Sequence, residues 1–293
     1  MAEVKDFIER MLQWQLIQLA SIRKSDVMAI YGPMYENLPA LVRDEIERMM
    51  EIQPNNDTLT ILLNTGGGSV DSVERTVEVI RQHYGCVDFI IPDQAMSAGT
   101  VFALSGDNIY MDYYSQLGPI DPQFFIDDNW IPVLGYLEKF EELNEKSRDG
   151  SLTPLEYALV EQLDLADLHQ YEQAREHSVE LLEKWLPAFK FKNWHKTHSS
   201  GQPVTSEMKQ KRAKEIALKL NDTKRWHAHS RGISMQVLQE ELNLIIEDIS
   251  SGEELQQVVK EIHTFIVDFM QTSGLYLCLR STSYNLEDGH GQS

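Results

Sequence analysis

Two short segments supply the residue types that a hydrolytic site needs, one rich in glycine and one centred on a serine. Residues 64–70 read Asn-Thr-Gly-Gly-Gly-Ser-Val and follow the apolar run Leu59–Leu63, whereas Ser97 follows a second apolar run, Val87–Ile91. A glycine turn can expose backbone N–H groups that hold an oxyanion, and a turn that opens a helix can present a nucleophilic hydroxyl. Together the two segments predict the two halves of a serine-type hydrolytic site.

Each segment also has a simpler interpretation. Gly66–Gly68 lacks the Lys-Ser/Thr of a phosphate loop and the Gly-x-Gly-x-x-Gly spacing of a dinucleotide site, although any tight turn there would need positive φ. Serine at the start of a helix is commonly an N-cap, and the local sequence by itself favours that role for Ser97. Its small neighbours Ala95, Ala98 and Gly99 would let a substrate carbonyl approach the hydroxyl. An oxyanion-binding turn fits the pair of segments better, because the serine lies one βαβ unit after the glycines.

The elements that must position these residues alternate between apolar strands and amphipathic helices. The periodicity predicts strands at Val27–Tyr31, Leu59–Leu63, Val87–Ile91 and Asn108–Asp112, and helices at Leu38–Met50, Val70–His83 and Ala98–Leu104. Such alternation with fully apolar strands indicates an α/β fold, with a parallel sheet covered by helices on both faces. Both turns would then emerge at the carboxyl edge of the sheet, where sites of this fold class assemble.

The rest of the chain is predicted to be mostly helical. We expect an N-terminal amphipathic helix in residues 1–25, an α/β core over 26–135, a helical insertion over 136–222, a completion of the core over 223–282 and a flexible tail over 283–293. Within the insertion, residues 153–186 predict one long, nearly uninterrupted helix, followed by a basic island at 190–219. Beyond it we expect a helix over 235–249, a capping box of Ser250 and Glu253 that opens a further helix, and a strand at Leu275–Leu279.

Composition limits the partners and the compartment. The chain has 293 residues, 42% of them apolar, which supports a packed core, and its 46 acidic against 26 basic side chains disfavour nucleic-acid binding. The two cysteines lie in apolar surroundings with no zinc-type spacing, so free thiols and neither a metal nor a cofactor are expected. No signal peptide and no apolar run of about 18 residues is present, which predicts a cytoplasmic protein without a membrane span.

Three motifs in order resemble a known group of enzymes. Asn64–Val70, the segment Ala-Met-Ser-Ala-Gly-Thr at 95–100, and Leu-Gly-Pro-Ile-Asp-Pro-Gln at 117–123 resemble the serine peptidases of the Clp/crotonase superfamily. The resemblance is greatest to the serine dehydrogenase proteinase family, which is related to signal peptide peptidase A and the Clp proteolytic subunit. It covers roughly residues 26–125 and implies a Clp/crotonase-like spiral ββα core. The order of the motifs is more specific for the superfamily than for the activity.

The resemblance implies roles for particular residues. Ser97 corresponds to the nucleophile of the family, and the N–H groups of Gly67 or Gly68 and of Ala98 would form the oxyanion hole. Two preset donors of this kind each contribute on the order of 3 kcal/mol to transition-state stabilisation.

The general base is the point at which the sequence departs from the Clp proteolytic subunit. The region that carries a histidine there reads Gly-Pro-Ile-Asp at 118–121 in this chain. His229, in the turn Trp226–Ile233, could accept the Ser97 proton while Asp121 holds its other ring nitrogen. Lys139 or Lys146 could take the same role, as a lysine does in signal peptide peptidases, or the chain could lack a competent base.

The residues therefore predict a serine-type peptidase that acts on a peptide or protein substrate and, by resemblance, forms a homo-oligomer. A catalytically silent Clp-like scaffold that binds a peptide or a partner protein is the alternative. Acyl-CoA chemistry of the crotonase type fits less well, because Ser97 stands where that chemistry usually places a carboxylate.

Overall fold

A six-stranded sheet forms the centre of the molecule in the computed structural model, which describes residues 2–52, 56–126, 129–197 and 201–282. Its strands are β1 (Asp26–Tyr31), β2 (Thr58–Asn64), β3 (Cys86–Ile90), β5 (Asn108–Met111), β10 (Glu247–Asp248) and β11 (Cys278–Ser281). Their order is β10-β5-β3-β2-β1-β11, and every neighbouring pair is parallel except β1 with β11. The prediction of an α/β fold with a mostly parallel sheet is confirmed.

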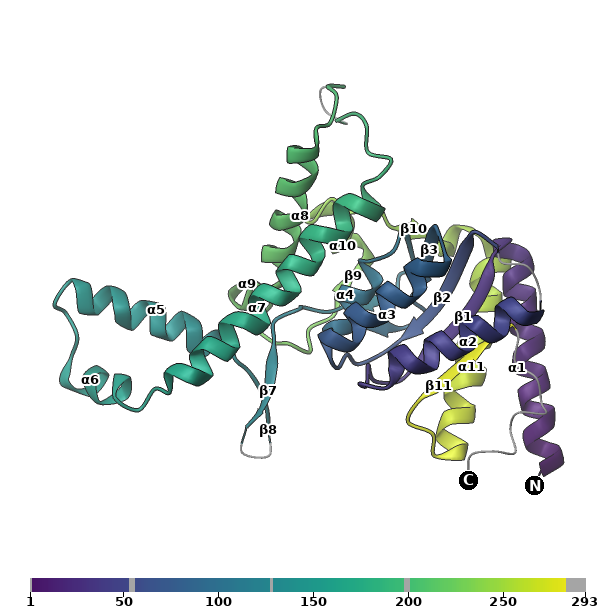
Figure 1. Ribbon diagram of the computed structural model, residues 1–293, viewed down its shortest axis with the longest axis horizontal. Helices are drawn as coiled ribbons and strands as arrows, with labels where there is room; N and C mark the ends of the chain where they lie inside the picture. The colour runs from purple at the N-terminus through teal and green to yellow at the C-terminus, as the bar shows by residue number, and fades with distance from the viewer. Residues whose placement is uncertain (1, 53–55, 127–128, 198–200, 283–293) are drawn as a thin grey trace.

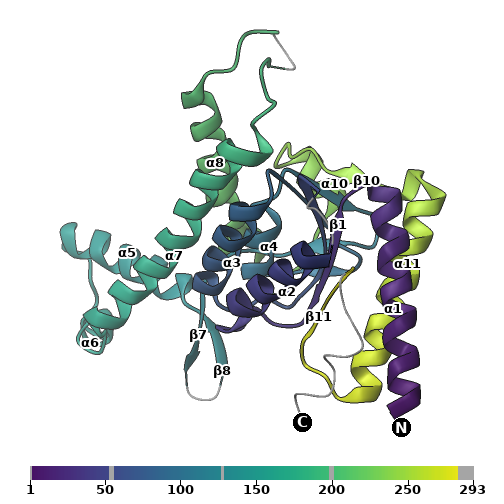
Figure 2. The same ribbon diagram turned by 45° about the vertical axis from the view of Figure 1, so that its right-hand side comes forward.

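Helices cover both faces of this sheet, as Figures 1 and 2 show. On one face lie α2 (Leu38–Ile52), α3 (Val70–His83) and α4 (Ala98–Ala103), and on the other α1 (Ala2–Arg23) and α11 (Glu253–Ser273) lie side by side. The strands are apolar on both sides, so Met28 and Ile30 join the core under α2 and α3, whereas Val27 and Ala29 join the core under α1 and α11. Strands buried on both faces form the continuous apolar runs seen in the sequence.

A second, small sheet begins at the carboxyl edge of the first. It contains β4 (Gln94–Ala95), β6 (Gln116–Leu117) and β9 (Ile233–Ser234), with β4 parallel to β6 and β6 antiparallel to β9. A separate hairpin of β7 (Gln123–Ile126) and β8 (Asn129–Pro132) follows β6. The small sheet matters most here, because its three strands lead to the candidate site.

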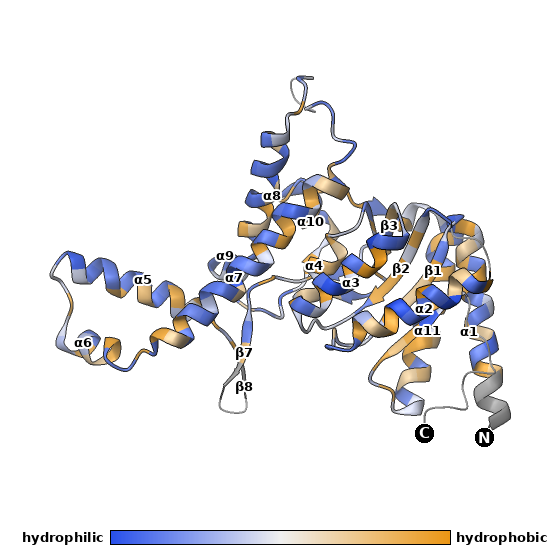
Figure 3. Ribbon diagram, viewed as in Figure 1, coloured by the Kyte–Doolittle hydropathy of each residue, from blue (hydrophilic) through white to orange (hydrophobic). Residues whose placement is uncertain are grey.

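The remaining helices project from this body, as the left and upper parts of Figure 1 show. They are α5 (Leu134–Arg148), α6 (Pro154–Val160), α7 (Leu165–Trp185), the π-helical η1 (Leu186–Lys190), α8 (Ser206–Leu220) and α9 (Thr223–Trp226). The base of α5 and the first half of α7 share a small apolar cluster of their own, which includes Leu137 and Tyr171. Elsewhere α5 is largely hydrophilic (Figure 3), whereas α6 and the start of α7 expose large apolar side chains, among them Leu155, Tyr157 and Leu165.

The structure corrects the prediction of one nearly uninterrupted helix over 153–186. The helix breaks between α6 and α7, where the Asp164 side chain accepts a hydrogen bond from the backbone N–H of Ala166 and caps α7. Thr153 and Glu156 form a capping box at the start of α6. The pattern of apolar residues continues across the break, so periodicity alone did not reveal it.

Three predictions near the C-terminus were also wrong. The helix expected over 235–249 is the short α10 (Met235–Glu240), after which Asn243 has a positive φ of 45° and Ile245 is 74% exposed. The Ser250–Glu253 capping box does not form, because η2 (Ile249–Ser251) occupies that segment and Gly252 is the N-cap of α11, with no side-chain hydrogen bond. The last strand begins at Cys278 rather than Leu275.

Some expectations stay open. The boundaries proposed for the core and the insertion remain predictions, and the tail over 283–293 lies outside the described residues. In the part of the chain that the structure describes, no helix is both long and apolar enough to cross a membrane.

Candidate active site

The glycine turn joins β2 to α3 and passes close to the serine segment. Gly67 and Gly68 have φ values of +107° and +144°, which L-residues rarely adopt. A Cβ at Gly67 would lie 2.9 Å from both the Met96 carbonyl oxygen and the Ser97 Cβ, and one at Gly68 would lie 2.7 Å from the Met34 carbonyl oxygen. Both glycines are therefore needed for packing, and the turn touches Ser97 directly.

Ser97 lies between β4 and α4 in a strained conformation. Its φ of 52° and ψ of −120° fall outside the regions favoured by L-residues, and its side chain makes no capping hydrogen bond to α4. The N-cap role that local sequence favoured is therefore wrong. Strain of this kind costs of order 1–3 kcal/mol and occurs preferentially at functional sites. A sharp strand-to-helix turn also exposes the nucleophile in unrelated serine hydrolases.

The amide groups around Ser97 differ in their availability. The backbone N–H of Gly67 donates to Thr65 Oγ1 at 3.0 Å, so it is already engaged. The N–H groups of Gly68 and of Ala98, the first residue of α4, donate to no other group among the described residues. Of the three predicted oxyanion donors, the N–H groups of Gly68 and Ala98 are therefore available. The Gly67 N–H is not, but the absence of a side chain at Gly67 allows the turn to pass close to Ser97.

His229 and Asp121 come together although they are far apart in the sequence. His229 Nδ1 lies 3.0 Å from Asp121 Oδ1, and both side chains are buried, with 13% and 4% of their surfaces exposed. The two atoms are close, but the ring nitrogen makes no hydrogen bond of regular geometry. A histidine whose Nδ1 faces a carboxylate keeps its Nε2 available as a proton acceptor.

The small sheet explains how three distant segments converge. Ser97 follows β4 by two residues, Asp121 follows β6 by four, and His229 precedes β9 by four. Because β4 and β6 are parallel and β9 is antiparallel to β6, all three residues lie beyond the same end of this sheet. The topology thus brings the serine, carboxylate and imidazole to one region, next to the glycine turn.

Two threonines that the sequence analysis did not single out hold the region together. Thr65 accepts the Gly67 N–H bond, and Thr65 pairs with Ala95 as an isolated bridge between the turn and β4. The buried Thr100 hydroxyl donates to the Ala95 carbonyl at 2.7 Å and accepts from the Gly118 N–H at 2.9 Å. The signal was present in the sequence, because Thr100 closes the Ser-Ala-Gly-Thr segment, but a tie to Gly118 requires the fold.

The two candidate lysines lie in the projecting part of the molecule. Lys139 and Lys146 are both on α5 and pair with carboxylates, Lys139 with Glu142 at 2.9 Å and Lys146 with Glu156 at 2.6 Å. Hydrogen bonds from Lys146 to Glu156 and Glu142 raise the pKa of that lysine. A catalytic lysine needs a lowered pKa, so the electrostatics of α5 do not suit that role.

Groups that could hold a metal are absent from the described residues, where no three His, Cys, Asp or Glu side chains cluster in a suitable way. Cys86 and Cys278 are free thiols. Burial, together with Asp107 and Asp88, raises the pKa of Cys86 to about 11, so its thiol is protonated at neutral pH. Neither cysteine has the exposed, electropositive surroundings of a reactive thiol.

A cavity of about 570 Å³ adjoins the glycine turn on the side of α11. Its wall includes Thr65 and Gly66 from the turn, Gln94 from β4, and Met270 and Tyr276 from α11 and the segment that follows it. Cavities at the carboxyl edge of a parallel sheet are the usual binding sites of this fold class.

Relatives of known sequence match only part of the chain. Two uncharacterized proteins of Methanocaldococcus jannaschii are 29% identical over 135 residues and 30% identical over 106 residues. These matches cover 46% and 36% of this chain, and 45% and 37% of the relatives, so the chain spans less than half the length of the curated relatives it matches.

Two solved structures are similar to this chain. The membrane-bound stomatin-specific protease 1510-N, in complex with a substrate peptide, has a TM-score of 0.44 at 15% identity and covers 75% of this chain and 73% of its own. ClpP1 from Listeria monocytogenes has a TM-score of 0.43 at 14% identity and covers 78% of this chain and 94% of its own. At TM-scores below 0.5 these likenesses add no weight to an assignment.

The family is shown by a match of a different kind. The model of the ClpP-like SDH-type serine proteinases matches residues 7–201, about two thirds of the chain, and this range includes the glycine turn, Ser97 and Asp121. The chain belongs to the ClpP-like SDH-type serine proteinase family.

Proposed function

We propose that this protein is a serine-type peptidase in which Ser97 is the nucleophile, His229 the general base and Asp121 the residue that orients the imidazole. The strongest support is the backbone of Ser97, which is strained, uncapped and in contact with Gly67. A serine that serves as a helix N-cap would have an unstrained backbone and a capping hydrogen bond, and backbone strain is concentrated at functional sites.

The chemistry follows from these roles. Ser97 Oγ attacks the carbonyl carbon of the scissile bond while His229 Nε2 accepts its proton and Asp121 stabilises the imidazolium. The N–H groups of Gly68 and Ala98 donate to the oxyanion of the tetrahedral intermediate, which collapses to an acyl-enzyme as the amine leaves with the proton from His229. Water then attacks the acyl-enzyme by the same route in reverse.

Labelling with a small fluorophosphonate probe tests this assignment. We expect the wild-type protein to be labelled and the Ser97→Ala variant to lose both labelling and peptide hydrolysis. Ser251→Ala, at an exposed serine remote from the turn, serves as the matched control and keeps both. Labelling at a serine other than Ser97 would overturn the proposal.

His229→Gln and Asp121→Asn test the base. Removal of a triad member typically lowers kcat by about 10⁴-fold or more, so both variants should label far more slowly than wild type. Unchanged labelling in His229→Gln would exclude this histidine as the base.

A silent scaffold remains the second candidate, because the Gly67 N–H is already bonded to Thr65 and the His229–Asp121 contact is not a regular hydrogen bond. The scaffold predicts no labelling, with peptide binding that survives Ser97→Ala. Acyl-CoA chemistry instead predicts thermal stabilisation by CoA, which the other two functions do not.

We also propose that the protein forms a homo-oligomer and acts in the cytoplasm. One face of α1 exposes the large apolar side chains of Phe7 (64%), Trp14 (53%) and Ile17 (49%). Exposed apolar side chains of this kind support contact between this face and another subunit. Sedimentation velocity would detect the assembly, and Trp14→Glu should weaken it. A monomer at micromolar concentration would contradict this part of the proposal.

A further inference from the structure

Thr65 lies at the start of the glycine turn, and its backbone is bonded to the segment that leads to Ser97. The Thr65 N–H donates to the Gln94 carbonyl at 2.9 Å, and the Thr65 carbonyl accepts from the Met96 N–H at 3.0 Å. These two bonds lie on either side of Ala95, with which Thr65 forms an isolated parallel bridge. The residue before Ser97 is therefore attached directly to the residue before the three glycines.

The methyl group of Thr65 contacts the other side of the serine turn, which we define as residues 96–99. A Cβ built on Gly99 would lie 2.3 Å from Thr65 Cγ2, so the methyl group packs against the Gly99 backbone. The Gly99 N–H donates to the Met96 carbonyl at 2.8 Å and closes the turn around Ser97. Thr65 thus holds the serine turn at two points, through its backbone before Ser97 and through its methyl group after it.

The hydroxyl group of Thr65 holds the glycine turn. Its oxygen, Oγ1, accepts the Gly67 N–H at 3.0 Å. The Gly67 backbone approaches Ser97 so closely that a Cβ on this glycine would lie 2.9 Å from the Ser97 Cβ. While the bond to Thr65 is in place, the Gly67 N–H cannot donate to an oxyanion. That role is left to the N–H groups of Gly68 and Ala98, which have no acceptor in the described part of the chain.

The hydroxyl and the methyl group of Thr65 depend on one torsion angle. Because threonine is branched at Cβ, rotation about χ1 moves both groups together. The residue is only 3% exposed, and the close approach of Gly99 limits the space for rotation. A rotation that released the Gly67 N–H would also move the methyl group away from Gly99. A single stiff side chain therefore holds the glycine turn and the serine turn in a fixed relation.

We propose that Thr65 is a positioning residue, whose hydroxyl group fixes the glycine turn and whose methyl group fixes the strained turn at Ser97. The inference rests on the proposed peptidase function. In that reaction Thr65 acts through its neighbours, because it sets the place of the Ser97 hydroxyl relative to the available amides of Gly68 and Ala98. A misplacement of about 1 Å can cost a hundredfold in rate, so loss of either contact should slow the chemical step without weakening binding.

Two substitutions separate the hydroxyl from the methyl group. Thr65→Val keeps the shape and removes the acceptor of the Gly67 N–H, whereas Thr65→Ser keeps the acceptor and removes the methyl group. Labelling by a small fluorophosphonate over a range of concentrations gives a maximal rate constant and a half-saturating concentration. We expect the maximal rate constant to fall by about tenfold to a hundredfold in Thr65→Val and by about tenfold in Thr65→Ser. The half-saturating concentrations should stay within about threefold of wild type.

Thr60→Val is the matched control, on the same strand. Thr60 is also a fully buried threonine, and its hydroxyl lies 2.6 Å from the Ser25 hydroxyl, so the substitution likewise leaves a buried polar group without its partner. It lies five residues before Thr65, or roughly 16 Å along an extended chain. This variant should label at the wild-type maximal rate. A fall as large as that of Thr65→Val would mean that general loosening of the fold explains the effect, and would overturn the proposal.

Hydrogen exchange of the Gly67 amide tests the hydroxyl contact without turnover. Loss of the acceptor in Thr65→Val should speed this exchange by about tenfold or more, because the N–H loses its hydrogen bond. Thr65→Ser should return the exchange rate to within about threefold of wild type. Equally slow exchange in wild type and Thr65→Val would overturn the role of the hydroxyl.

The wild-type protein separates failure of this inference from failure of the proposed function. If wild-type Ser97 is not labelled, the peptidase function fails and the positioning role fails with it. If wild type, Thr65→Val and Thr65→Ser all label with the same maximal rate constant, the peptidase stands and only the positioning role is overturned. Where Thr65→Val does not fold, the maximal rate constant of Thr65→Ser decides the proposal in the same way.

Discussion

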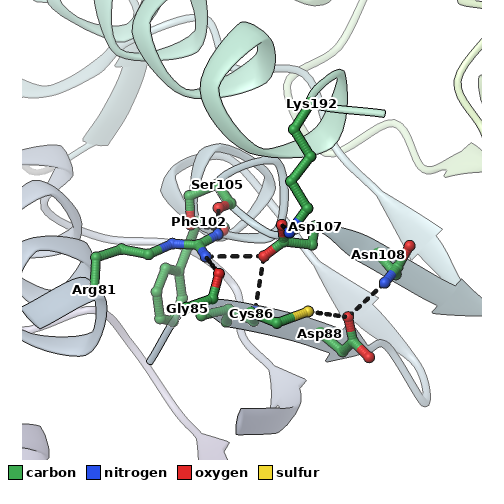
Figure 4. A network of polar contacts seen from close by, with 10 residues as sticks. Arg81, Gly85, Cys86, Asp88, Phe102, Ser105, Asp107, Asn108 and Lys192 are labelled. Carbon is green, nitrogen blue, oxygen red and sulfur yellow. Dashed lines mark hydrogen bonds and ion pairs between the residues drawn. The ribbon is translucent and has the colours of Figure 1, made fainter. Parts of the chain in front are cut away.

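The two ends of the same parallel strands differ sharply in how their polar groups are satisfied. At the carboxyl edge, Ser97 is strained and the N–H groups of Gly68 and Ala98 have no acceptor among the described residues. At the amino edge, Figure 4 shows a dense network in which Asp107 and Asp88 accept from several donors. The first arrangement leaves donors available to a group that the protein itself does not supply, whereas most polar groups of the second have partners within the protein.

The carboxylates of the amino edge have several partners each. Asp107 Oδ2 accepts from Arg81 and from the Val87 N–H, both at 2.8 Å, and its other oxygen forms an ion pair with Lys192. Asp88 accepts from Arg23 at 2.8 Å and from Asn108 at 2.7 Å. Buried charges with this many partners are structural, so a cluster of charged residues alone is a poor indicator of a functional site.

The same network ties the projecting helices to the core. The Arg81 guanidinium at the end of α3 stacks on the Phe189 ring of η1 at 3.6 Å, and Lys192 follows η1. The first residues of the basic island predicted at 190–219 are thus half-buried rather than a freely solvated surface. Here lysines offset the acidic groups of the strand ends.

Removal of Asp107 should have the largest effect on stability. Asp107→Ala leaves Arg81 and the partly exposed Lys192 without their partner, and we expect a loss of about 3–5 kcal/mol in the free energy of unfolding, measured with urea. Asp44→Ala, at a 52% exposed carboxylate paired with Arg43, is the control and should change it by less than about 0.5 kcal/mol. Equal losses in both variants would contradict the comparison.

The Asp107 effect should also depend on pH. Burial would raise the pKa of Asp107, but hydrogen bonds from Lys192, Val87 and Arg81 hold it below the ordinary value of 3.8. A carboxylate whose pKa is lower in the folded state than in the unfolded state stabilises the fold fully above its unfolded-state pKa. That stabilisation is lost as the pH falls through the folded-state pKa. The difference between wild type and Asp107→Asn should therefore shrink below about pH 4.

At the carboxyl edge, Gly67→Ala should affect activity more than stability. The new Cβ would lie 2.9 Å from both Ser97 Cβ and the Met96 carbonyl, at a φ of +107° that alanine disfavours. We expect the rate of fluorophosphonate labelling to fall by about a hundredfold or more, comparable to the loss of an oxyanion donor. Gly135→Ala, where a Cβ meets nothing within 4 Å, is the control and should label at the wild-type rate.

Lys190 is the one described amino-edge residue whose removal we expect to stabilise the protein. Desolvation by burial lowers the pKa of this lysine to about 8, although Glu247, Asp88 and Asp107 oppose the shift. Because the unfolded state holds the proton more tightly between about pH 8 and 10.5, wild-type stability should rise with pH across that window. Lys190→Met should add on the order of 2 kcal/mol at pH 7 and almost nothing above about pH 10.5.

Thermal and urea unfolding from pH 7 to 11 would measure this effect. Lys211→Met, at an exposed lysine of α8, controls for the loss of a positive charge in an acidic chain. A destabilised Lys190→Met protein at pH 7 would mean that the lysine is paired more favourably than its burial suggests.

The smallest effect is expected at His177, where α7 meets the start of α3. His177 Nε2 lies 3.0 Å from Glu74 Oε2, and its Nδ1 lies 3.3 Å from Asp71 Oδ1. Because Asp71 is 85% exposed, His177→Gln should cost less than about 1 kcal/mol and change Ser97 labelling less than threefold. A labelling rate that fell tenfold or more would show that the projecting helices position the glycine turn through α3.

Local patterns predicted the α/β core well. The helix expected at Val70–His83 forms with those bounds, because a serine cap precedes it and its apolar residues recur at helical spacing on one face. The apolar strands β1, β2, β3 and β5 likewise form within one residue of their predicted ends. In these segments propensity, periodicity and burial agree.

Where local and tertiary preferences differ, the predictions failed. Residues 153–186 keep a helical pattern through the break before Asp164, and the helix expected to 249 ends at Glu240. Ser97 has the residue type and position of an N-cap, yet its backbone conformation is unusual and its hydroxyl makes no capping hydrogen bond. The contact between Asp121 and His229 joins residues 108 positions apart and depends on the pairing of β6 with β9.

The sequence alone therefore determined the parallel sheet and most elements of the α/β core, since these depend on patterns among neighbouring residues. Tertiary structure decided which amides near Ser97 remain free, which carboxylate faces His229, and that an uncharged cavity opens beside Gly66. Those features arise from close approach between segments that are distant in the chain. Their positions depend on how strands pair and helices pack, so no local pattern of residue types predicts these positions.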